Sequence, residues 1–314
     1  MRRNRGRSSR DSYLRLILVC CVILACVAIL LCRRFGRNPE KDAAQDQIEN
    51  DSEGKENQEE QKDERETLHF IHAWGEWHDM VVDLDVKQHG YDWSCLTNTE
   101  EGISYTGDAR YTIRKGVDVS RHQGKIDWER VKADGYDFAI LRIGYREYGS
   151  KGALHVDEMF HENMVGAKRA GLDVGVYLFS QAIDEEETLE EVELVLNNLK
   201  DYELEFPVAF DPERIRDDDA RTDSVEGEQF TQNTVLFCEK VKEAGYQPMV
   251  YSNMIWEAFE FDMKALKDYP IWYADYGPIP QTPYDFTFWQ YSEKGTVDGI
   301  EGLVDVNVQF CGEE

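Results

Sequence analysis

The sequence predicts an α/β protein built around a compact, irregular (β/α) barrel of about eight strands. Two observations favour this fold class: short apolar runs alternate with amphipathic stretches from residue 115 onward, and Gly171 and Gly245 stand where two of these stretches would stop as helices. Short strands that alternate with helices form parallel sheets. The expected strands span residues 116–120, 138–144, 174–179, 206–210, 248–252, 271–274, 287–291 and 304–306.

Four helices are expected between the earlier strands. Residues 127–132 form a short one, and residues 157–170 carry Phe160, Met164 and Ala167 at helical spacing. The stretches 185–199 and 228–244 are longer and amphipathic. No comparable pattern separates the last strands, so we expect helices to be missing near the end of the barrel.

Residues 67–110 precede the barrel and are predicted to form a small β-rich extension that packs on it. The stretch contains short strand-like pieces, such as residues 80–84, between turn residues. Its aromatic side chains are suited either to buried packing or to stacking on sugar rings. They include Trp74, Trp77, Tyr91, Trp93 and Tyr105.

The first 37 residues are predicted to be a cytoplasmic basic tail and a transmembrane signal anchor. Residues Leu16 to Cys32 form an almost uninterrupted apolar run of 17 residues, near the lower limit for spanning a bilayer. Six arginines precede this run and three follow it, which favours a cytoplasmic N-terminus. A cleaved signal peptide is the alternative, although no small-residue cleavage site follows the run before Arg33. We expect a single-pass protein of the cell membrane with an extracellular C-terminal domain.

Residues 38–66 are expected to be a disordered acidic linker. From residue 40 to residue 66 the chain has twelve acids and four bases, with almost no large apolar side chains. The formal net charge of the whole chain is −28, and residues 67–314 account for all of it, because the basic N-terminal segment and the acidic segment after it cancel. Such acidity favours solubility, and it excludes nucleic acid as a partner because phosphates would be repelled.

Cysteine usage indicates a fold that rests on a hydrophobic core. Four of the seven cysteines lie inside the apolar run near the N-terminus. The remaining three are Cys95, Cys238 and Cys311, which cannot all pair and show no metal-ligand spacing. We therefore expect neither a disulfide framework nor a metal or other cofactor.

Polar side chains follow the carboxyl ends of the expected strands, where (β/α) barrels carry their chemistry. The clearest case is Asp211 and Glu213, which flank Pro212 and share one face, because alternate residues of a strand do so. Two carboxylates held close cannot both ionise freely, so one takes up a proton. A protonated acid beside an ionised base suits cleavage of glycosidic bonds.

The other strand ends complete the candidate site. The candidate catalytic residues are Glu213, Asp211, Asp118 and Asp305, and the candidate substrate-binding residues are Tyr177, Tyr251, Asn253, Tyr273, Trp289 and Gln290. Each alone has a structural explanation, such as a turn for Asp118 or core packing for Trp289. Their joint occurrence at consecutive strand ends favours a site. The sequence has no nucleophile-elbow glycines around a serine and no phosphate-binding glycine loop.

A series of motifs between about residues 111 and 310 resembles glycoside hydrolase family 25, the Chalaropsis-type lysozymes. The motifs are GVDVSRHQG at 116–124, IDW at 126–128, DxxFxxN at 157–163, AGLxVGVY at 170–177, DxE at 211–213, GY at 245–246, YSN at 251–253, IWxA at 271–274, WQY at 289–291, GI at 299–300 and VDxN at 304–307. Their number and order make the resemblance specific. Pro212 is a departure, since the family often has an aliphatic or aromatic residue there, and proline removes a backbone donor.

The resemblance implies an N-acetylmuramidase that cleaves the β-1,4 bond from N-acetylmuramic acid to N-acetylglucosamine in bacterial peptidoglycan. Glu213 would be the general acid/base, and Asp118, Asp211 and Asp305 the other carboxylates. Asp211 is expected to stay ionised, and a retaining route assisted by the substrate's own acetamido group is favoured. Peptidoglycan glycan strands, and the membrane through Leu16 to Cys32, are the expected partners of a monomer.

Two alternatives stay open. A non-catalytic cell-wall glycan-binding barrel would keep the aromatic side chains but is expected to lack one of the four carboxylates, which are all present. A metal-dependent hydrolase could use His122 with Asp118, Asp211 and Glu213, although metal sites usually contain more histidines.

Overall fold

The computed structural model describes residues 66–72, 75–99, 102–216 and 218–312, all within the compact unit Lys62–Glu314. The predicted membrane anchor and nearly all of the predicted acidic linker lie outside the described residues. Among the residues that are described, no helix combines the length and the apolar character needed to cross a bilayer.

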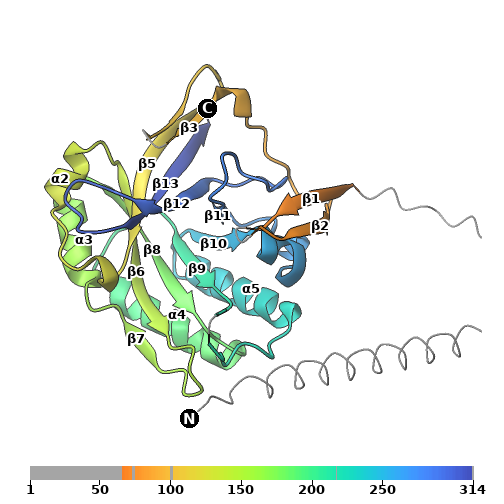
Figure 1. The fold of residues 1–314 in the computed structure, drawn as a ribbon. Helices are drawn as coiled ribbons and strands as arrows, with labels where there is room; N and C mark the ends of the chain where they lie inside the picture. Colours follow the sequence, from red (N-terminus) through yellow and green to blue (C-terminus); the bar gives the residue numbers. More distant parts are fainter. Residues whose placement is uncertain (1–65, 73–74, 100–101, 217, 313–314) are drawn as a thin grey trace, which may run out of the picture. The chain divides into compact units, whose positions relative to one another are not determined.

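Eight strands close into a barrel, and all eight were predicted (Figure 1). Their order around the barrel is β5-β13-β12-β11-β10-β9-β8-β6, and β6 pairs with β5 to close it. The short strand β7 (Leu154–Val156) adds to the carboxyl end of β6. The barrel strands are β5 (Tyr111–Val119), β6 (Phe138–Arg146), β8 (Asp173–Ser180), β9 (Val208–Pro212), β10 (Pro248–Asn253), β11 (Ile271–Ala274), β12 (Phe288–Gly295) and β13 (Val304–Gly312).

The direction of the last strand differs from the parallel sheet that the sequence predicts. The neighbours from β5 through β6 and β8 to β12 pair in parallel, but β13 is antiparallel to both β12 and β5. The reason is the short connection after β12, which turns at Gly299 and Gly302 with positive φ values of 97° and 87°. A parallel crossover needs about a dozen residues or more. The start of β13 therefore lies beside the carboxyl ends of the parallel strands.

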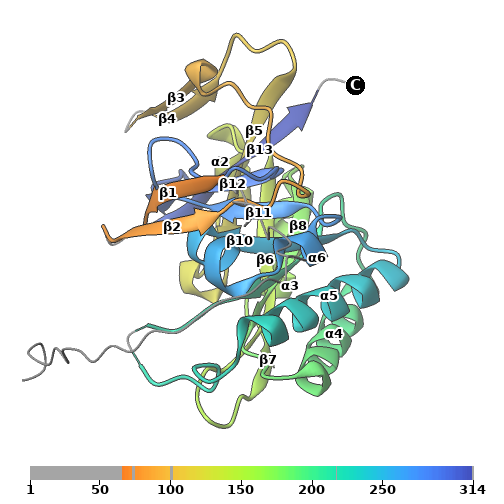
Figure 2. The same ribbon diagram turned by 90° about the vertical axis from the view of Figure 1, so that its right-hand side faces the viewer.

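The four predicted helices are present with small shifts at their ends. They are α2 (Trp128–Ala133), α3 (Phe160–Arg169), α4 (Glu185–Leu199) and α5 (Gly227–Glu243), and Figure 2 shows α4 and α5 side by side. Asp127 and Asp184 begin α2 and α4, because their side chains accept hydrogen bonds from free backbone N–H groups of the first turn. Four short helical pieces among the described residues were not predicted. They are the 3-10 turns η1 (Trp93–Cys95) and η2 (Arg121–Gln123), the π-helical turn η3 (Trp256–Glu260), and α6 (Met263–Leu266).

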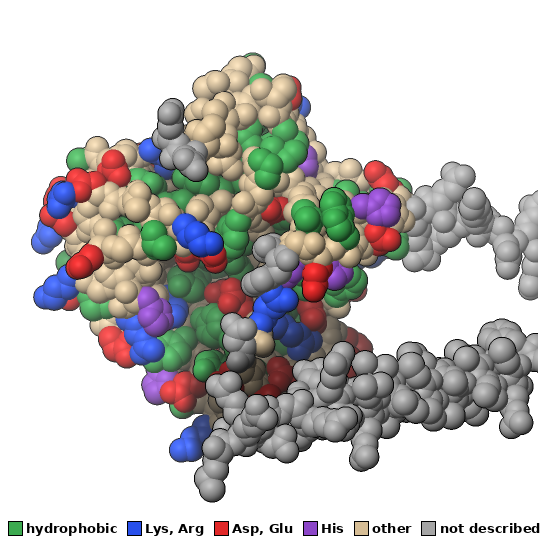
Figure 3. Space-filling model, viewed as in Figure 1, with side chains coloured by type: hydrophobic (Ala, Val, Ile, Leu, Met, Phe, Trp, Pro, Cys, Tyr) green, Lys and Arg blue, Asp and Glu red, His purple; other side chains and the backbone are tan. Residues whose placement is uncertain are grey.

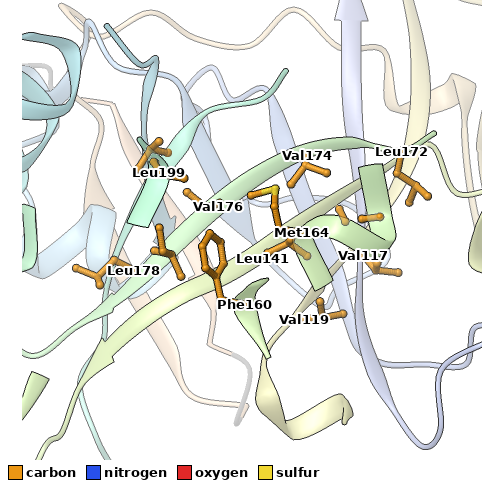
Figure 4. Packing of buried hydrophobic residues seen from close by; sticks show 14 of the residues in the cluster. Val117, Val119, Leu141, Phe160, Met164, Leu172, Val174, Val176, Leu178 and Leu199 are labelled. Carbon is orange, nitrogen blue, oxygen red and sulfur yellow. The ribbon is translucent and has the colours of Figure 1, made fainter. Parts of the chain in front are cut away.

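Apolar side chains pack on both sides of the barrel wall, because successive residues of a strand point to opposite faces. Outside it, Phe160 and Met164 of α3 pack on Leu141, Val174 and strand neighbours (Figure 4). Inside it, one layer of buried side chains fills the lumen. This layer consists of Phe138, Ile140, Ala209, Met249, Tyr251, Trp272, Ala274 and Phe288. Because side chains fill the interior, a substrate can bind only at the rim of the barrel.

The predicted β-rich extension forms two hairpins, β1 (Thr67–Ile71) with β2 (Trp77–Val81) and β3 (Leu96–Thr99) with β4 (Gly102–Tyr105). The short 3-10 helix η1 (Trp93–Cys95) lies between them. Phe70, Met80 and Tyr105 join a buried cluster that also contains Phe286 and Phe310 of the barrel region. The extension therefore shares a hydrophobic core with the β11–β13 side of the barrel.

Candidate active site

The four predicted catalytic carboxylates come together at one rim of the barrel. Asp118 lies near the end of β5, Asp305 near the start of β13, Asp211 in β9 and Glu213 just after it. The pKa of each is influenced by at least one of the others. Figure 3 shows acidic side chains recessed in a hollow on one face of the molecule.

Asp118 is buried and held by two side-chain amides. Its Oδ2 accepts a hydrogen bond of 2.9 Å from Gln290 Nε2 and one of 2.8 Å from Asn307 Nδ2. Burial raises the pKa of Asp118 to about 6, and the two amide hydrogen bonds oppose that rise. Hydrogen bonds to the charged form favour ionisation, so the two amide donors stabilise Asp118 as a carboxylate.

Both amides are fixed in the orientation that presents nitrogen to Asp118. Gln290 Oε1 accepts from the hydroxyls of Tyr251 (3.1 Å) and Tyr276 (2.8 Å), and Asn307 Oδ1 accepts from Trp272 Nε1 (2.8 Å). Since an indole N–H can only donate, the Asn307 oxygen must face it. Three aromatic residues thus determine how Asp118 is held.

Asp305 lies opposite Asp118 across the β5–β13 pair. Burial and the negative charge of Asp118 raise the pKa of Asp305 to about 8, and a hydrogen bond links the two carboxyls. The protonated Asp305 donates and Asp118 accepts, so at neutral pH the pair holds one proton. Two such groups titrate as a unit.

Asp211 differs from the expectation that it stays ionised. Its side chain is 5% exposed, and its Oδ1 has no hydrogen-bond partner. Burial, followed by the charges of Glu213 and Asp118, raises the pKa of Asp211 well above its usual range, although the nearby Arg142 acts in the opposite direction. Burial and the neighbouring charges thus act against the ionised form that the sequence leads us to expect for Asp211.

Glu213 is half-buried at the end of β9. Burial and the charge of Asp305 raise the pKa of Glu213 to about 7. Its backbone carbonyl accepts a hydrogen bond from Nε2 of the buried Gln181, which fixes the chain at this point. A carboxyl with a pKa near neutrality can both give and take a proton, as a general acid/base must.

Three of the predicted substrate-binding side chains lie in the barrel interior near these carboxylates. Tyr177 and Tyr251 contact the Trp272 indole edge-on, with ring centroids 5.7 Å and 4.9 Å away, and Gln290 bonds to Asp118. The charge of Asp118 contributes to raising the pKa of both tyrosines, which places them within its electrostatic reach.

The structure does not bring Tyr273 and Trp289 into this group. Both are fully buried on the outer face of the barrel wall, where Tyr273 Oη donates to Asp275 Oδ2 and Trp289 Nε1 donates to the Asp275 carbonyl. Strand alternation is the reason, because their neighbours Trp272 and Gln290 face inward. The predicted role of these two residues in sugar binding is therefore corrected.

Asn253 lies at the end of β10 with its side-chain oxygen already in use. It accepts from the backbone N–H groups of Ile255 (3.0 Å) and Trp256 (3.3 Å), so it begins the helical turn that follows. A further contact of Asn253 with substrate stays a prediction.

Two site residues, Trp272 and Tyr276, were missing from the strand-end residues that the sequence suggests, whereas Asn307 is part of the VDxN motif at 304–307. Trp272 lies within the motif at 271–274, and its place on the same strand face as Ala274 was the available signal. Tyr276 follows β11 in a loop, where periodicity gives no indication. Among the described residues, no group of three or more His, Cys, Asp or Glu side chains is arranged to hold a metal ion, which leaves the metal-site alternative without structural support.

Comparison with known proteins supports what the barrel and its carboxylates indicate. The model of the glycosyl hydrolases family 25 matches residues 117–300, a segment that contains Asp118, Asp211 and Glu213. The chain belongs to glycosyl hydrolase family 25. The predicted family membership is thus confirmed, with Asp305 lying just beyond the matched segment.

Several proteins to which the chain is similar are lysozymes. The chain is 27% identical to an autolytic lysozyme of Clostridium acetobutylicum over 62% of this chain and 55% of the relative, and 28% identical to lysozyme M1 of Streptomyces globisporus over 67% and 74%. The chain thus spans little more than half the length of the first of these. The crystal structure of a bacterial lysozyme from Streptomyces coelicolor is 25% identical, with a TM-score of 0.52 over 62% of this chain and 90% of that one.

Proposed function

We propose that this family 25 protein is a lysozyme-type glycoside hydrolase that cleaves β-1,4 bonds between N-acetylmuramic acid and N-acetylglucosamine in bacterial peptidoglycan. The observation that carries the proposal is Glu213, a half-buried carboxyl whose pKa is raised to about 7 beside three further carboxyls. The lysozymes among its relatives support the choice of substrate.

In the proposed reaction Glu213 gives its proton to the glycosidic oxygen while the bond from that oxygen to C1 of the muramic acid breaks. The carbonyl oxygen of the substrate's own acetamido group forms a bond to C1 and makes a cyclic intermediate. Water then attacks C1 and breaks the bond from C1 to the acetamido oxygen, which restores the acetamido group, and the Glu213 carboxylate takes the proton that the water loses. Configuration at C1 is retained, since two inversions occur.

Asp211 and Asp118 have complementary roles in this proposal. Positive charge that develops on the sugar ring and acetamido group lowers the pKa of a nearby carboxyl. Asp211, buried and with an unpaired Oδ1, would accept a hydrogen bond from the acetamido N–H and orient that group, and the positive charge would strengthen the bond. Asp118 supplies the standing negative charge, because its two amide donors hold it in the ionised form.

We further propose that the enzyme works at the outer side of the cell membrane, anchored by residues Leu16 to Cys32. A disordered tether of the length of residues 40–66 has a root-mean-square reach on the order of 30 Å. The enzyme would then act on cell-wall material near the membrane surface.

The test is to incubate the full-length protein with purified peptidoglycan and identify the released fragments by mass spectrometry. Fragments with reducing N-acetylmuramic acid ends are expected from the parent, and a loss of about 100-fold or more in their release is expected for Glu213→Gln. Glu203→Gln, an exposed carboxyl before β9, is the matched control and should match the parent. Binding to the wall without fragment release by the parent would instead support the glycan-binding alternative.

A further inference from the structure

The loop between β11 and β12 (residues 275–287) is held along its length by the N-terminal extension. The firmest contact is made by Gln281. Its side-chain Oε1 accepts from the backbone N–H of Ile71 at 2.9 Å, and its Nε2 donates to the Ile71 carbonyl at 3.0 Å. A side-chain amide that satisfies both backbone groups of one β1 residue acts like one more strand residue at that edge.

Further hydrogen bonds join the extension to the rest of the loop, toward the start of β12. The pairs are the Asp83 N–H to Tyr284 Oη (2.9 Å), the His89 N–H to the Pro283 carbonyl (3.2 Å), the Asp285 N–H to the Lys87 carbonyl (2.9 Å), and Tyr91 Oη to the Phe286 carbonyl. Gln88 and Tyr284 also form an antiparallel bridge. Most of these bonds involve the backbone of the loop, so they fix its path.

The same loop carries Tyr276 to the active site. Asp275 Oδ2 accepts from both the backbone N–H and the side-chain Nε2 of Gln281, each at 3.1 Å, and Asp275 Oδ1 accepts from the Gly277 N–H at 2.8 Å. Tyr276, between these anchored residues, donates from its hydroxyl to Gln290 Oε1 at 2.8 Å. Gln290 in turn donates to Asp118. Two sets of hydrogen bonds, joined by the peptide link between Asp275 and Tyr276, therefore connect β1 to the buried carboxylate.

We infer that residues 67–99 are a clamp on the β11–β12 loop that positions Tyr276, and through Gln290 orients Asp118, for the reaction. Gln281 is the positioning residue on the loop, since its side chain bonds to both β1 and Asp275. The clamp lies outside the residues 117–300 that the family model matches. The inference rests on the proposed function, because its readout is hydrolysis.

A purely structural role of the extension is the competing explanation, since Phe70, Met80 and Tyr105 are buried against the barrel region. The two explanations differ in what happens when the Tyr276 hydroxyl is removed. If Gln281 acts through the Tyr276 hydroxyl, substituting Gln281 should have little further effect on the rate in a protein that already carries Tyr276→Phe. If Gln281 only adds stability, the two substitutions act independently.

The experiment is a double-mutant cycle in the full-length protein, with Gln281→Met, Tyr276→Phe and the double variant. The rate of release of reducing ends from purified peptidoglycan is the readout. Each single variant is expected to lose about fivefold or more, and the double variant to lie within about twofold of Tyr276→Phe. Gln232→Met, an exposed glutamine on α5, is the matched control and should keep the parent rate.

Losses that multiply in the double variant, or a parent-like rate for Gln281→Met, would overturn the clamp. If Gln281→Met does not fold, as judged by circular dichroism, Tyr91→Phe replaces it in the cycle, because it removes one loop contact and keeps the ring. Glu213→Gln is measured alongside. If that variant keeps the parent rate, the proposed function fails and the clamp with it; if it is inactive while the cycle is multiplicative, only the clamp fails.

Discussion

Asp118 and Asp305 lie directly opposite each other on the antiparallel strands β5 and β13. Burial raises the pKa of both carboxyls, to about 6 and about 8, and a hydrogen bond between them holds one proton at neutral pH. Asp118 receives two further hydrogen bonds from amides. Within the pair, Asp118 is the ionised hydrogen-bond acceptor and Asp305 is the protonated donor, although the two groups are chemically identical.

The pH dependence of hydrolysis should report the titration of Glu213. The proposed reaction needs this carboxyl protonated, and burial with the charge of Asp305 raises its pKa to about 7. The rate at low substrate is therefore expected to fall tenfold per pH unit once the pH is well above about 7. Initial rates between pH 4 and pH 9 at constant ionic strength measure this limb. A rate that stays constant up to pH 9 contradicts the assignment.

Replacing Asp305 by the neutral isostere Asn should leave that limb close to its position in the parent. Because the pKa of Asp305 is raised to about 8, its side chain is largely neutral in the range where Glu213 titrates, and the substitution exchanges one neutral side chain for another. The side-chain amide can still donate to Asp118, and activity near pH 5 is expected to survive. The same rate profile, recorded for Asp305→Asn and the parent, provides the check; a limb that moves to lower pH by one unit or more would contradict the protonated state of Asp305.

Trp272→Phe should lower activity through its effect on Asn307. The substitution keeps an aromatic ring in the lumen but removes the N–H that donates to Asn307 Oδ1, which frees the amide to turn away from Asp118. A hydrogen bond of this kind contributes about 1 kcal/mol, so a loss of roughly fivefold in rate is expected. Trp77→Phe, on a side chain that is 70% exposed in β2, serves as the control. Equal effects of the two substitutions would speak against the orienting role.

Glu257 is expected to make the folded state less stable as the pH rises. Burial raises its pKa from about 4.5 to about 8, while a hydrogen bond from the Thr282 hydroxyl acts against the rise. The folded state therefore binds a proton that the unfolded state has released between these two values, and stability falls with pH across this window. Glu257→Gln should raise Tm at pH 8 by about 2 °C or more and leave Tm at pH 4 almost unchanged.

Thermal unfolding followed by circular dichroism at both pH values gives this comparison. Glu239→Gln, on α5, is the control carboxyl, and its Tm should change equally little at both values. A Glu257→Gln protein that is less stable than the parent at pH 8 would mean that the ionised carboxylate stabilises the fold.

The strands and the carboxylates could be predicted because each leaves a local signal in the sequence. Apolar runs mark buried strands, and Asp211 and Glu213 follow such a run at strand spacing. The face of the barrel wall on which the Tyr273 and Trp289 side chains lie could not be predicted in this way. Strands buried on both faces are apolar throughout, so residues 271–274 give no indication of which side chains enter the lumen.

Two other features depend on contacts that are distant in the sequence. The direction of β13 follows from the short connection after β12 and from pairing with β5, almost two hundred residues earlier. The upward shift of the Asp211 pKa follows from burial among groups that come from three other strands and from the loop after β9. Neither the direction of β13 nor this pKa shift is encoded in a local pattern of the sequence, and both change how the site is understood.

The reversed direction of β13 also determines where additional polypeptide can be attached. Because Asp305 stands near the start of the strand, the strand runs away from the carboxylates and ends at Gly312, which pairs with Tyr111 (Figure 1). Seven residues of extended chain separate that point from Asp305, about 23 Å. A reporter or binding module fused after Gly312 would leave the barrel at the far rim. The enzyme therefore offers a site for modular additions that does not obstruct the path of its substrate.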